Sequence, residues 1–219
     1  QDLHLGASTG ISVFPGDGAE AESLLKAADI AVFDAKEAGR GGHRFYAPSL
    51  NAGTLQHLAM ESSLRRALKE KEFSLHYQPQ VDLRTGKLCG VEALLRWHHP
   101  ELGLVMPAEF IGLAESSGLI TPLGDWLLRE ACSQWRTWVE KDLVDARLFV
   151  NLSARQFQKE DVVNRVSAVL AETGLPPGML GLEITESAAM KNAQYTRDTL
   201  VRLHDRGLEI ALDDFGTGY

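Results

Sequence analysis

The spacing of hydrophobic residues changes near Phe73 and separates two parts of the chain. Ahead of that point, it predicts a strand over 7–14, a helix over 19–38 and a short strand over 43–46. This strand-helix-strand unit has too little apolar surface to fold alone. A helical pattern over 54–71 follows, and we expect a linker helix that packs its apolar face on the next domain.

After Phe73, strand-like segments alternate with helical ones. The predicted strands are FSLHYQPQVDL, KLCGVEALLRW, ARLFVNLSA, LGLEITES and LEIALDDFG, and the predicted helices cover 107–117, 122–141, 157–173 and 192–206. This alternation predicts an α/β fold with a parallel sheet and crossover helices. No glycine-rich phosphate loop of the Rossmann or P-loop kind follows any strand, which argues against those nucleotide-binding folds.

Composition and charge narrow the range of functions. With 44% hydrophobic and 24% charged residues, the chain is globular rather than disordered, and no apolar run is long enough to span a bilayer. A formal net charge of −8 argues against binding of long nucleic acid through the surface field. A small anionic ligand is still compatible with this charge if metal ions or arginines reverse its sign inside a cleft.

Cysteine usage bears on the cellular compartment. Cys89 and Cys132 lie in apolar segments without metal-ligand spacing, and we predict that both are buried. Unpaired buried thiols are typical of a reducing compartment, and residues 1–15 show no secretory signal. We therefore expect a cytoplasmic location, although the parent protein could be anchored to a membrane through regions outside this chain.

Four predicted strands carry an acid or an amide at or near their C-terminal ends. These residues are Glu92, Asn151, Glu183 and the pair Asp213-Asp214. In a β/α barrel the C-terminal strand ends converge on one site. Carboxylate and amide oxygens are hard donors that suit Mg²⁺ or Mn²⁺ rather than zinc. Because converging acids repel one another without a cation, the joint pattern predicts a divalent-metal site.

Each of these residues alone also has an ordinary structural explanation. A single acid at a strand end often caps the next helix or pairs with an arginine, and Asn151 could be a turn residue. Asp213 and Asp214 are adjacent, so both can reach one site only if the strand ends there. The loop Phe215–Gly218 is consistent with such an end, and a two-metal site would use the pair with one bridging acid.

From about Phe73 the sequence resembles the EAL family of cyclic di-GMP phosphodiesterases. Five motifs match in order: Tyr77-Gln78-Pro79, Glu92-Ala93-Leu94-Leu95-Arg96-Trp97, Asn151-Leu152-Ser153, Leu182-Glu183-Ile184-Thr185-Glu186 and Asp213-Asp214-Phe215-Gly216-Thr217-Gly218-Tyr219. Residues 8–46 resemble the C-terminal part of a GGDEF, or diguanylate cyclase, domain. The resemblance implies a GGDEF remnant of α+β type over 1–48, a linker helix over 49–72 and part of a TIM-like (β/α) EAL barrel over 73–219.

The resemblance also implies a role for individual residues. The first-metal ligands would be Glu92, Asn151, Glu183 and Asp213. Asp213 and Asp214 would serve a second metal, and Glu186 would brace the loop that follows them. In this interpretation the catalytic set is Glu92, Asp213, Asp214 and Glu186.

Three further residues would contact the substrate. Arg96 would hold a phosphate, for which its guanidinium fork is well shaped, and Gln78 and Leu94 would line the nucleotide pocket. The simpler explanations are a surface ion pair for Arg96 and a helix cap for Glu186.

The implied activity is hydrolysis of cyclic di-GMP to linear pGpG with two Mg²⁺ or Mn²⁺ ions, which Ca²⁺ would inhibit. Two cations lower the pKa of a bridging water and stabilise charge on the phosphoryl oxygens. The family further implies a homodimer through the EAL domain. The alternative is a degenerate module that binds the dinucleotide without cutting it, and a third interpretation gives the helix over 54–71 a dimerising role. Every ligand expected within this span is present, which favours the enzyme.

The chain also departs from the family pattern. The resemblance stops at Tyr219, whereas the family's barrel continues with strands that carry a lysine and a further glutamate of the active site. Residues 1–46 lack the Gly-Gly-Asp-Glu-Phe signature, so we expect no cyclase activity. We therefore expect an internal fragment of a longer protein, inactive or unstable by itself unless a second chain closes the sheet.

Overall fold

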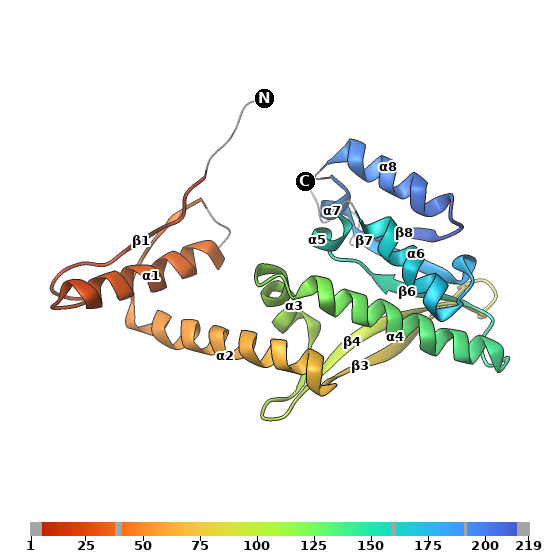
Figure 1. Ribbon diagram of the computed structural model, residues 1–219, viewed down its shortest axis with the longest axis horizontal. Helices are drawn as coiled ribbons and strands as arrows, with labels where there is room; N and C mark the ends of the chain where they lie inside the picture. Colours follow the sequence, from red (N-terminus) through yellow and green to blue (C-terminus); the bar gives the residue numbers. More distant parts are fainter. Residues whose placement is uncertain (1–5, 38–40, 159–160, 191, 214–219) are drawn as a thin grey trace. The chain divides into compact units, whose positions relative to one another are not determined.

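The chain divides into two compact units, Gln1–Ser62 and Ser63–Tyr219. The computed structural model describes residues 6–37, 41–158, 161–190 and 192–213. Each unit is described by itself below (Figure 1).

The first unit contains the predicted strand, helix and strand. β1 (Thr9–Ile11) and β2 (His43–Phe45) pair in parallel, and α1 (Ala21–Glu37) connects them. The helix lies directly on the backbone of β1, because a Cβ added at Gly10 would overlap the carbonyl oxygen of Ala28. The strands are shorter than the sequence pattern predicted, with three residues each.

The linker helix begins six residues before the start at 54 that the hydrophobic pattern predicted, and close to the start at 49 that the family resemblance implied. α2 runs over Pro48–Glu70, and proline is well accommodated in the first turn of a helix. Leu58 is 53% exposed, whereas Leu64 and Ala67 are fully buried. Among the described side chains of α2, the prediction of an apolar packing face therefore holds only for the last turns, which belong to the second unit.

The second unit is built on a six-stranded sheet with the order β3-β4-β6-β7-β8, and β5 added to β4. β6 (Arg147–Asn151), β7 (Leu180–Thr185) and β8 (Glu209–Asp213) are parallel to β4 (Leu88–His99). β3 (Phe73–Val81) is antiparallel to β4, so the prediction of a wholly parallel sheet is wrong at this pair. The six-residue connection between them is too short for a crossover and forms a hairpin instead.

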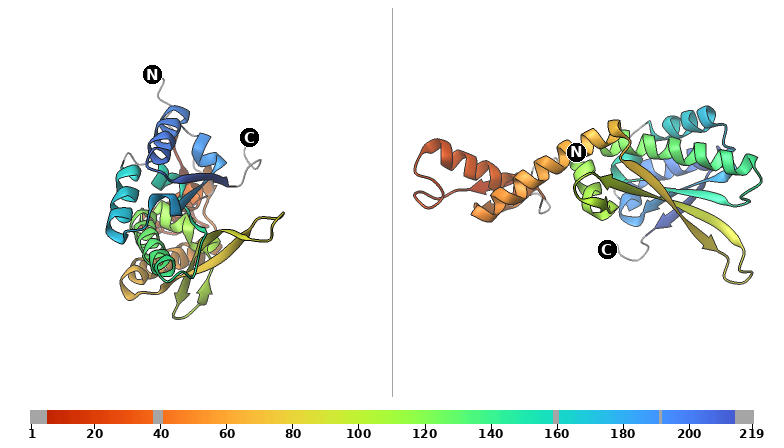
Figure 2. Two further views of the ribbon diagram at one scale, coloured as in Figure 1. Left: turned by 90° about the vertical axis from the view of Figure 1, so that its right-hand side faces the viewer. Right: turned by 90° about the horizontal axis from the view of Figure 1, so that it is seen from below.

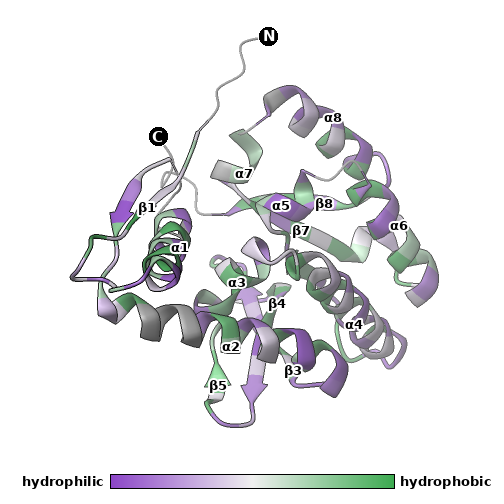
Figure 3. Cartoon of the chain, turned by 60° about the vertical axis from the view of Figure 1, so that its left-hand side comes forward, coloured by the Kyte–Doolittle hydropathy of each residue, from purple (hydrophilic) through white to green (hydrophobic). Residues whose placement is uncertain are grey.

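Helices cover one side of this sheet. The predicted helices correspond to α3 (Pro107–Ser116), α4 (Ile120–Glu140), α6 (Val162–Thr173) and α8 (Ala193–His204). α4 packs on β6 and α6, α6 contacts α8, and α8 packs on β8 (Figure 1). Hydrophobic and hydrophilic residues recur along α4, as the amphipathic pattern predicted (Figure 3).

Four short elements escaped prediction because they are too short to show a period. These are β5 (Gly103–Val105), α5 (Ala154–Phe157), the 3-10 turn η1 (Pro177–Met179) and α7 (Glu186–Met190). α5 lies just ahead of the helix predicted over 157–173 and overlaps it only at Phe157. Its start is set by a capping box between Ser153 and Gln156.

The core lies between the sheet and its helices. On β4 the alternate residues Val91, Ala93, Leu95 and Trp97 are buried, and the residues between them face the other side of the sheet. Trp97 is fully buried, and its Nε1 donates to Glu72 Oε2 at 2.9 Å. The opposite side of β4, called the inward face below, carries Glu92, Leu94 and Arg96 of the predicted site.

The two cysteines differ in exposure. Cys132 is fully buried in α4, and burial raises the pKa of its thiol to about 12. Cys89 is exposed, so the prediction that it is buried was wrong. Cys89 lies near the turn of the β3–β4 hairpin, which projects beyond the helices in both views of Figure 2.

None of the described helices is both long and apolar enough to cross a membrane.

Candidate metal and substrate site

The strand register places most of the predicted ligands on the inward face of the sheet. Asn151 on β6 is the direct partner of Glu183 on β7, and Thr185 on β7 is the partner of Asp213 on β8. Side chains two residues apart on a strand share a face, so Asp213, Glu183 and Asn151 face the same side. On β4, the residues that pair in parallel with β6 end at Ala93, and Glu92 is next to this last pair.

A short hydrogen bond joins two of the predicted ligands. Asn151 Nδ2 donates to Glu92 Oε1 at 2.6 Å, between residues that are 59 positions apart in the sequence. The contact joins β4 to β6 at the end of their parallel pairing, whose last pair is Ala93 and Val150. The sequence prediction that these two polar residues lie together is therefore matched by the structure, while their role as metal ligands stays a prediction.

The Glu183 carboxyl lies in a crowded acidic environment. Burial raises its pKa to about 7, and the charges of Glu92 and Asp213 act in the same direction. A hydrogen bond from Gln80 Nε2 to Glu183 Oε1, at 3.4 Å, opposes this rise. Two acids from other strands are thus close enough to Glu183 to repel its charge, which is the situation that a bound cation relieves.

The chemistry of these donors suits a divalent cation. Their present arrangement, however, does not form a set of ligands around one point. Glu92, Glu183 and Asp213 offer carboxylate oxygens, and Asn151 offers an amide oxygen once its side chain turns its NH₂ away from Glu92. Among the described residues, no three His, Cys, Asp or Glu side chains form a group able to hold a metal ion. Asp214, the remaining predicted ligand, lies outside the described residues.

A phenylalanine ring packs on the same face of the sheet as these predicted ligands. Phe149 precedes Asn151 by two residues on the same face of β6 and is 8% exposed. A Cβ added at Gly90 would lie 2.7 Å from Phe149 Cε2, and one added at Gly181 would overlap the ring. The strands on either side of β6 therefore each have a glycine where they contact the Phe149 ring.

This packing gives a testable expectation for stability. Gly181→Ala should lower the free energy of unfolding by about 1–3 kcal/mol, because the new methyl group overlaps the Phe149 ring. Urea unfolding measures the change. Gly178→Ala is the matched control, because the nearest atom to an added Cβ there is 4.0 Å away. Equal stability of the two variants would contradict the described packing.

The predicted substrate residues lie on β3 and β4, the pair of strands that also carries Glu92. Leu94 lines a pocket of about 230 Å³ together with Asn151 and Gln156, between β4 and helices α3, α4 and α5. Gln78 is exposed on β3 and pairs with Glu92 in the register. Arg96 follows Leu94 by two residues on the same face, and its Nη1 donates to the backbone oxygen of Leu95 at 2.8 Å.

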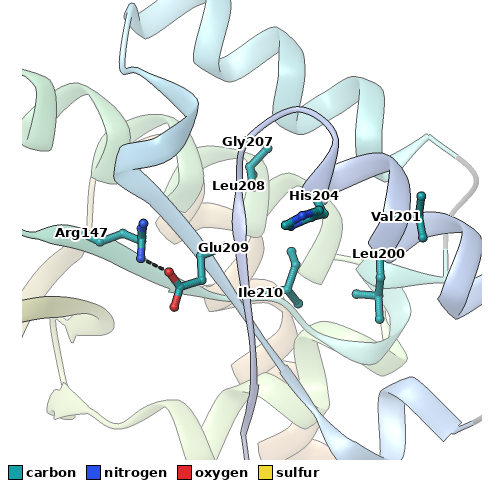
Figure 4. A pocket seen from close by; sticks show the side chains of 8 residues that line it. All are labelled: Arg147, Leu200, Val201, His204, Gly207, Leu208, Glu209 and Ile210. Carbon is teal, nitrogen blue, oxygen red and sulfur yellow. Dashed lines mark ion pairs between the residues drawn. The ribbon is translucent and has the colours of Figure 1, made fainter.

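A larger pocket lies at the opposite end of the strands. Its volume is about 520 Å³, and Figure 4 shows its lining, which includes the ion pair of Arg147 with Glu209 and the side chain of His204. Arg147 and Glu209 are the first residues of β6 and β8. Because parallel sheets place their active sites at the C-terminal strand ends, we assign the chemistry to the acidic cluster and not to this pocket.

Comparison with known proteins identifies the family. The EAL domain family model matches residues 61–219. The chain belongs to the EAL domain family. MucR of Pseudomonas aeruginosa, named a bifunctional diguanylate cyclase/cyclic di-GMP phosphodiesterase, is 44% identical over 218 residues, which cover 100% of this chain and 32% of MucR. The cyclic di-GMP phosphodiesterase PdeR of Escherichia coli is 35% identical over 218 residues, covering 100% of this chain and 33% of PdeR.

Solved EAL structures share the fold. The structure of the MucR phosphodiesterase in complex with c-di-GMP has a TM-score of 0.72 at 45% identity, and covers 74% of this chain and 65% of that one. This likeness confirms the predicted α/β fold with part of a TIM-like barrel of the EAL type. The chain spans about a third of the length of the curated relatives named here. The assignment of residues 1–48 to a GGDEF domain stays a prediction.

Sequence reasoning missed Gln80, Phe149 and the two glycines that flank the ring. Gln80 stands two residues after Gln78, and strand alternation alone would have placed both on one face. The glycines within the predicted strands at Gly90 and Gly181 were also a signal, since an isolated glycine in a strand often marks a close approach. Glu186, the predicted brace, is half-buried at the start of α7.

Proposed function

We propose that the full-length protein hydrolyses cyclic di-GMP to linear pGpG with the help of divalent cations. One observation carries the proposal: Glu92, Asn151, Glu183 and Asp213, from four neighbouring strands of an EAL domain, gather on one inward face. The activities for which MucR and PdeR are named support the same substrate. Membership of the family implies dependence on a divalent metal, and the oxygen-only donors favour Mg²⁺ or Mn²⁺.

The residues of the chain divide the work between cation and substrate. Glu92, Asn151, Glu183 and Asp213 would hold the first cation, and Asp213 with Asp214 the second. Cations bound there would lower the pKa of the attacking water and neutralise charge on the phosphoryl oxygens. Glu186 would brace the loop after Asp213.

The substrate side of the cleft is formed by different residues. Arg96 would turn from the Leu95 carbonyl to a phosphate, which its planar fork can bind through two hydrogen bonds. Leu94 and the apolar walls of its pocket would accept one base, with Gln78 at the rim. Homodimerisation through the EAL domain stays a prediction, as does a cytoplasmic location.

A binding module without catalysis is the second candidate. It is favoured by the pocket of about 230 Å³ beside Leu94, which needs no cation to accept an apolar group. In that case the pocket would still accept one base of the dinucleotide, and hydrolysis would be absent.

A paired product and binding assay separates the two candidates. The full-length protein is incubated with cyclic di-GMP in Mg²⁺, Mn²⁺ or Ca²⁺, and pGpG is measured by chromatography. We expect pGpG in Mg²⁺ or Mn²⁺ and none in Ca²⁺, while calorimetry in Ca²⁺ shows binding. Binding without pGpG in all three ions would reject the enzyme in favour of the binding module.

A further inference from the structure

The Gln80 side chain reaches the acidic cluster from β3, an edge strand of the sheet. It belongs to β3, and its Nε2 donates to Glu183 Oε1 on β7 at 3.4 Å. β4 and β6 lie between these strands in the sheet order, so the two residues are three strand spacings apart, or about 14 Å along the sheet. The contact exists only because the sheet curves and brings its inward faces together.

The path of the Gln80 side chain is kept clear by glycine. Gly90 is the direct register partner of Gln80 on β4, and a Cβ added there would lie 2.5 Å from Gln80 Oε1. The same added atom would crowd the Phe149 ring. The carboxamide therefore lies over a strand position without a side chain, at the level just below the ligands.

The chemistry of this contact differs from that of the other neighbours of Glu183. Glu92 and Asp213 are acids that repel its charge, whereas the Gln80 amide donates a hydrogen bond and carries no charge. A neutral donor can hold a carboxylate without competing with a cation for it. Donors of this kind behind a ligand set its orientation and affect metal affinity.

We propose that Gln80 is a positioning residue that holds Glu183 Oε1 and leaves the second carboxylate oxygen for a cation shared with Glu92 and Asn151. The proposal rests on the proposed function for the nature of the site. It assigns to β3 a task in metal binding, in addition to the predicted substrate contact of Gln78.

The test measures binding of Mn²⁺ alone to the full-length protein by calorimetry. Gln80→Met keeps the length of the side chain but removes its donor, and should weaken Mn²⁺ binding about tenfold. Gln80→Asn keeps the amide but is one methylene too short to reach, and should weaken binding to a similar degree. Gln194→Met, on the exposed face of α8, is the matched control and should bind as the wild type does.

A double-mutant cycle distinguishes positioning from a general structural effect. In a Glu183→Gln background the carboxylate is gone, so Gln80→Met should change Mn²⁺ affinity less than about twofold. Wild-type affinity in Gln80→Met and Gln80→Asn, or an undiminished loss in the Glu183→Gln background, would overturn the proposal. Absence of pGpG formation by the wild type would instead overturn the proposed function and leave the Mn²⁺ result standing.

Discussion

Glu92→Ala is expected to lower pGpG formation by the full-length protein at least about a hundredfold, since a lost ligand should cost no less than a lost outer-shell partner. Glu92 receives the 2.6 Å hydrogen bond from Asn151, and its charge is among the causes that raise the pKa of Glu183. The substitution removes one oxygen donor and leaves Asn151 without its anchor. Turnover of cyclic di-GMP in Mg²⁺ or Mn²⁺, followed by chromatography of the product, measures the loss.

The matched control for this variant is Glu101→Ala. Glu101 is an exposed acid in the turn between β4 and β5, downstream of Glu92 on the chain. We expect its replacement to leave turnover unchanged. If Glu92→Ala retained wild-type turnover, Glu92 would not be a ligand and the site would have to be sought elsewhere in the domain.

The second large effect is expected from Trp97→Ala, which should lower the free energy of unfolding by about 3–5 kcal/mol. Trp97 is fully buried, and its ring centroid lies 5.8 Å from that of Phe73 and 5.4 Å from that of Phe110. The substitution opens a cavity between β4 and its helices and leaves Glu72 without the indole donor. Urea unfolding followed by circular dichroism measures the change.

Trp97→Phe separates the two contributions. It keeps an aromatic ring in the core but removes the hydrogen bond to Glu72, so we expect a loss of about 1–3 kcal/mol. A Trp97→Ala variant within about 1 kcal/mol of the wild type would show that β4 is not anchored through this residue.

The strand pattern predicted much of the second unit, and its errors have a physical cause. β4 continues to His99, seven residues past Glu92, because its end pairs with the unpredicted strand β5. Glu92 therefore lies where the parallel pairing with β6 ends, at Ala93, rather than at the end of the strand. Hydrophobic period reports that a segment is a strand, but not which neighbour it pairs with.

The same limit applies to the site. Asn151, Glu183 and Asp213 were predictable because each follows apolar residues of its own strand, which is local information. The contact of Gln80 with Glu183 depends on the curvature of the sheet over 103 positions of sequence, which no local pattern reports. The exposure of Cys89 likewise depends on how far the hairpin projects, and not on the apolar residues around it.

The ring of Phe149 between Gly90 and Gly181 has a consequence for how this sequence can vary. The three positions share one volume, so a larger residue at either glycine is compatible only with a smaller residue at 149. A change at one of them without the others would displace the strand residues two positions further on, which are Glu92, Asn151 and Glu183. Selection on Glu92, Asn151 and Glu183 would thus act as a joint constraint on the residues at 90, 149 and 181.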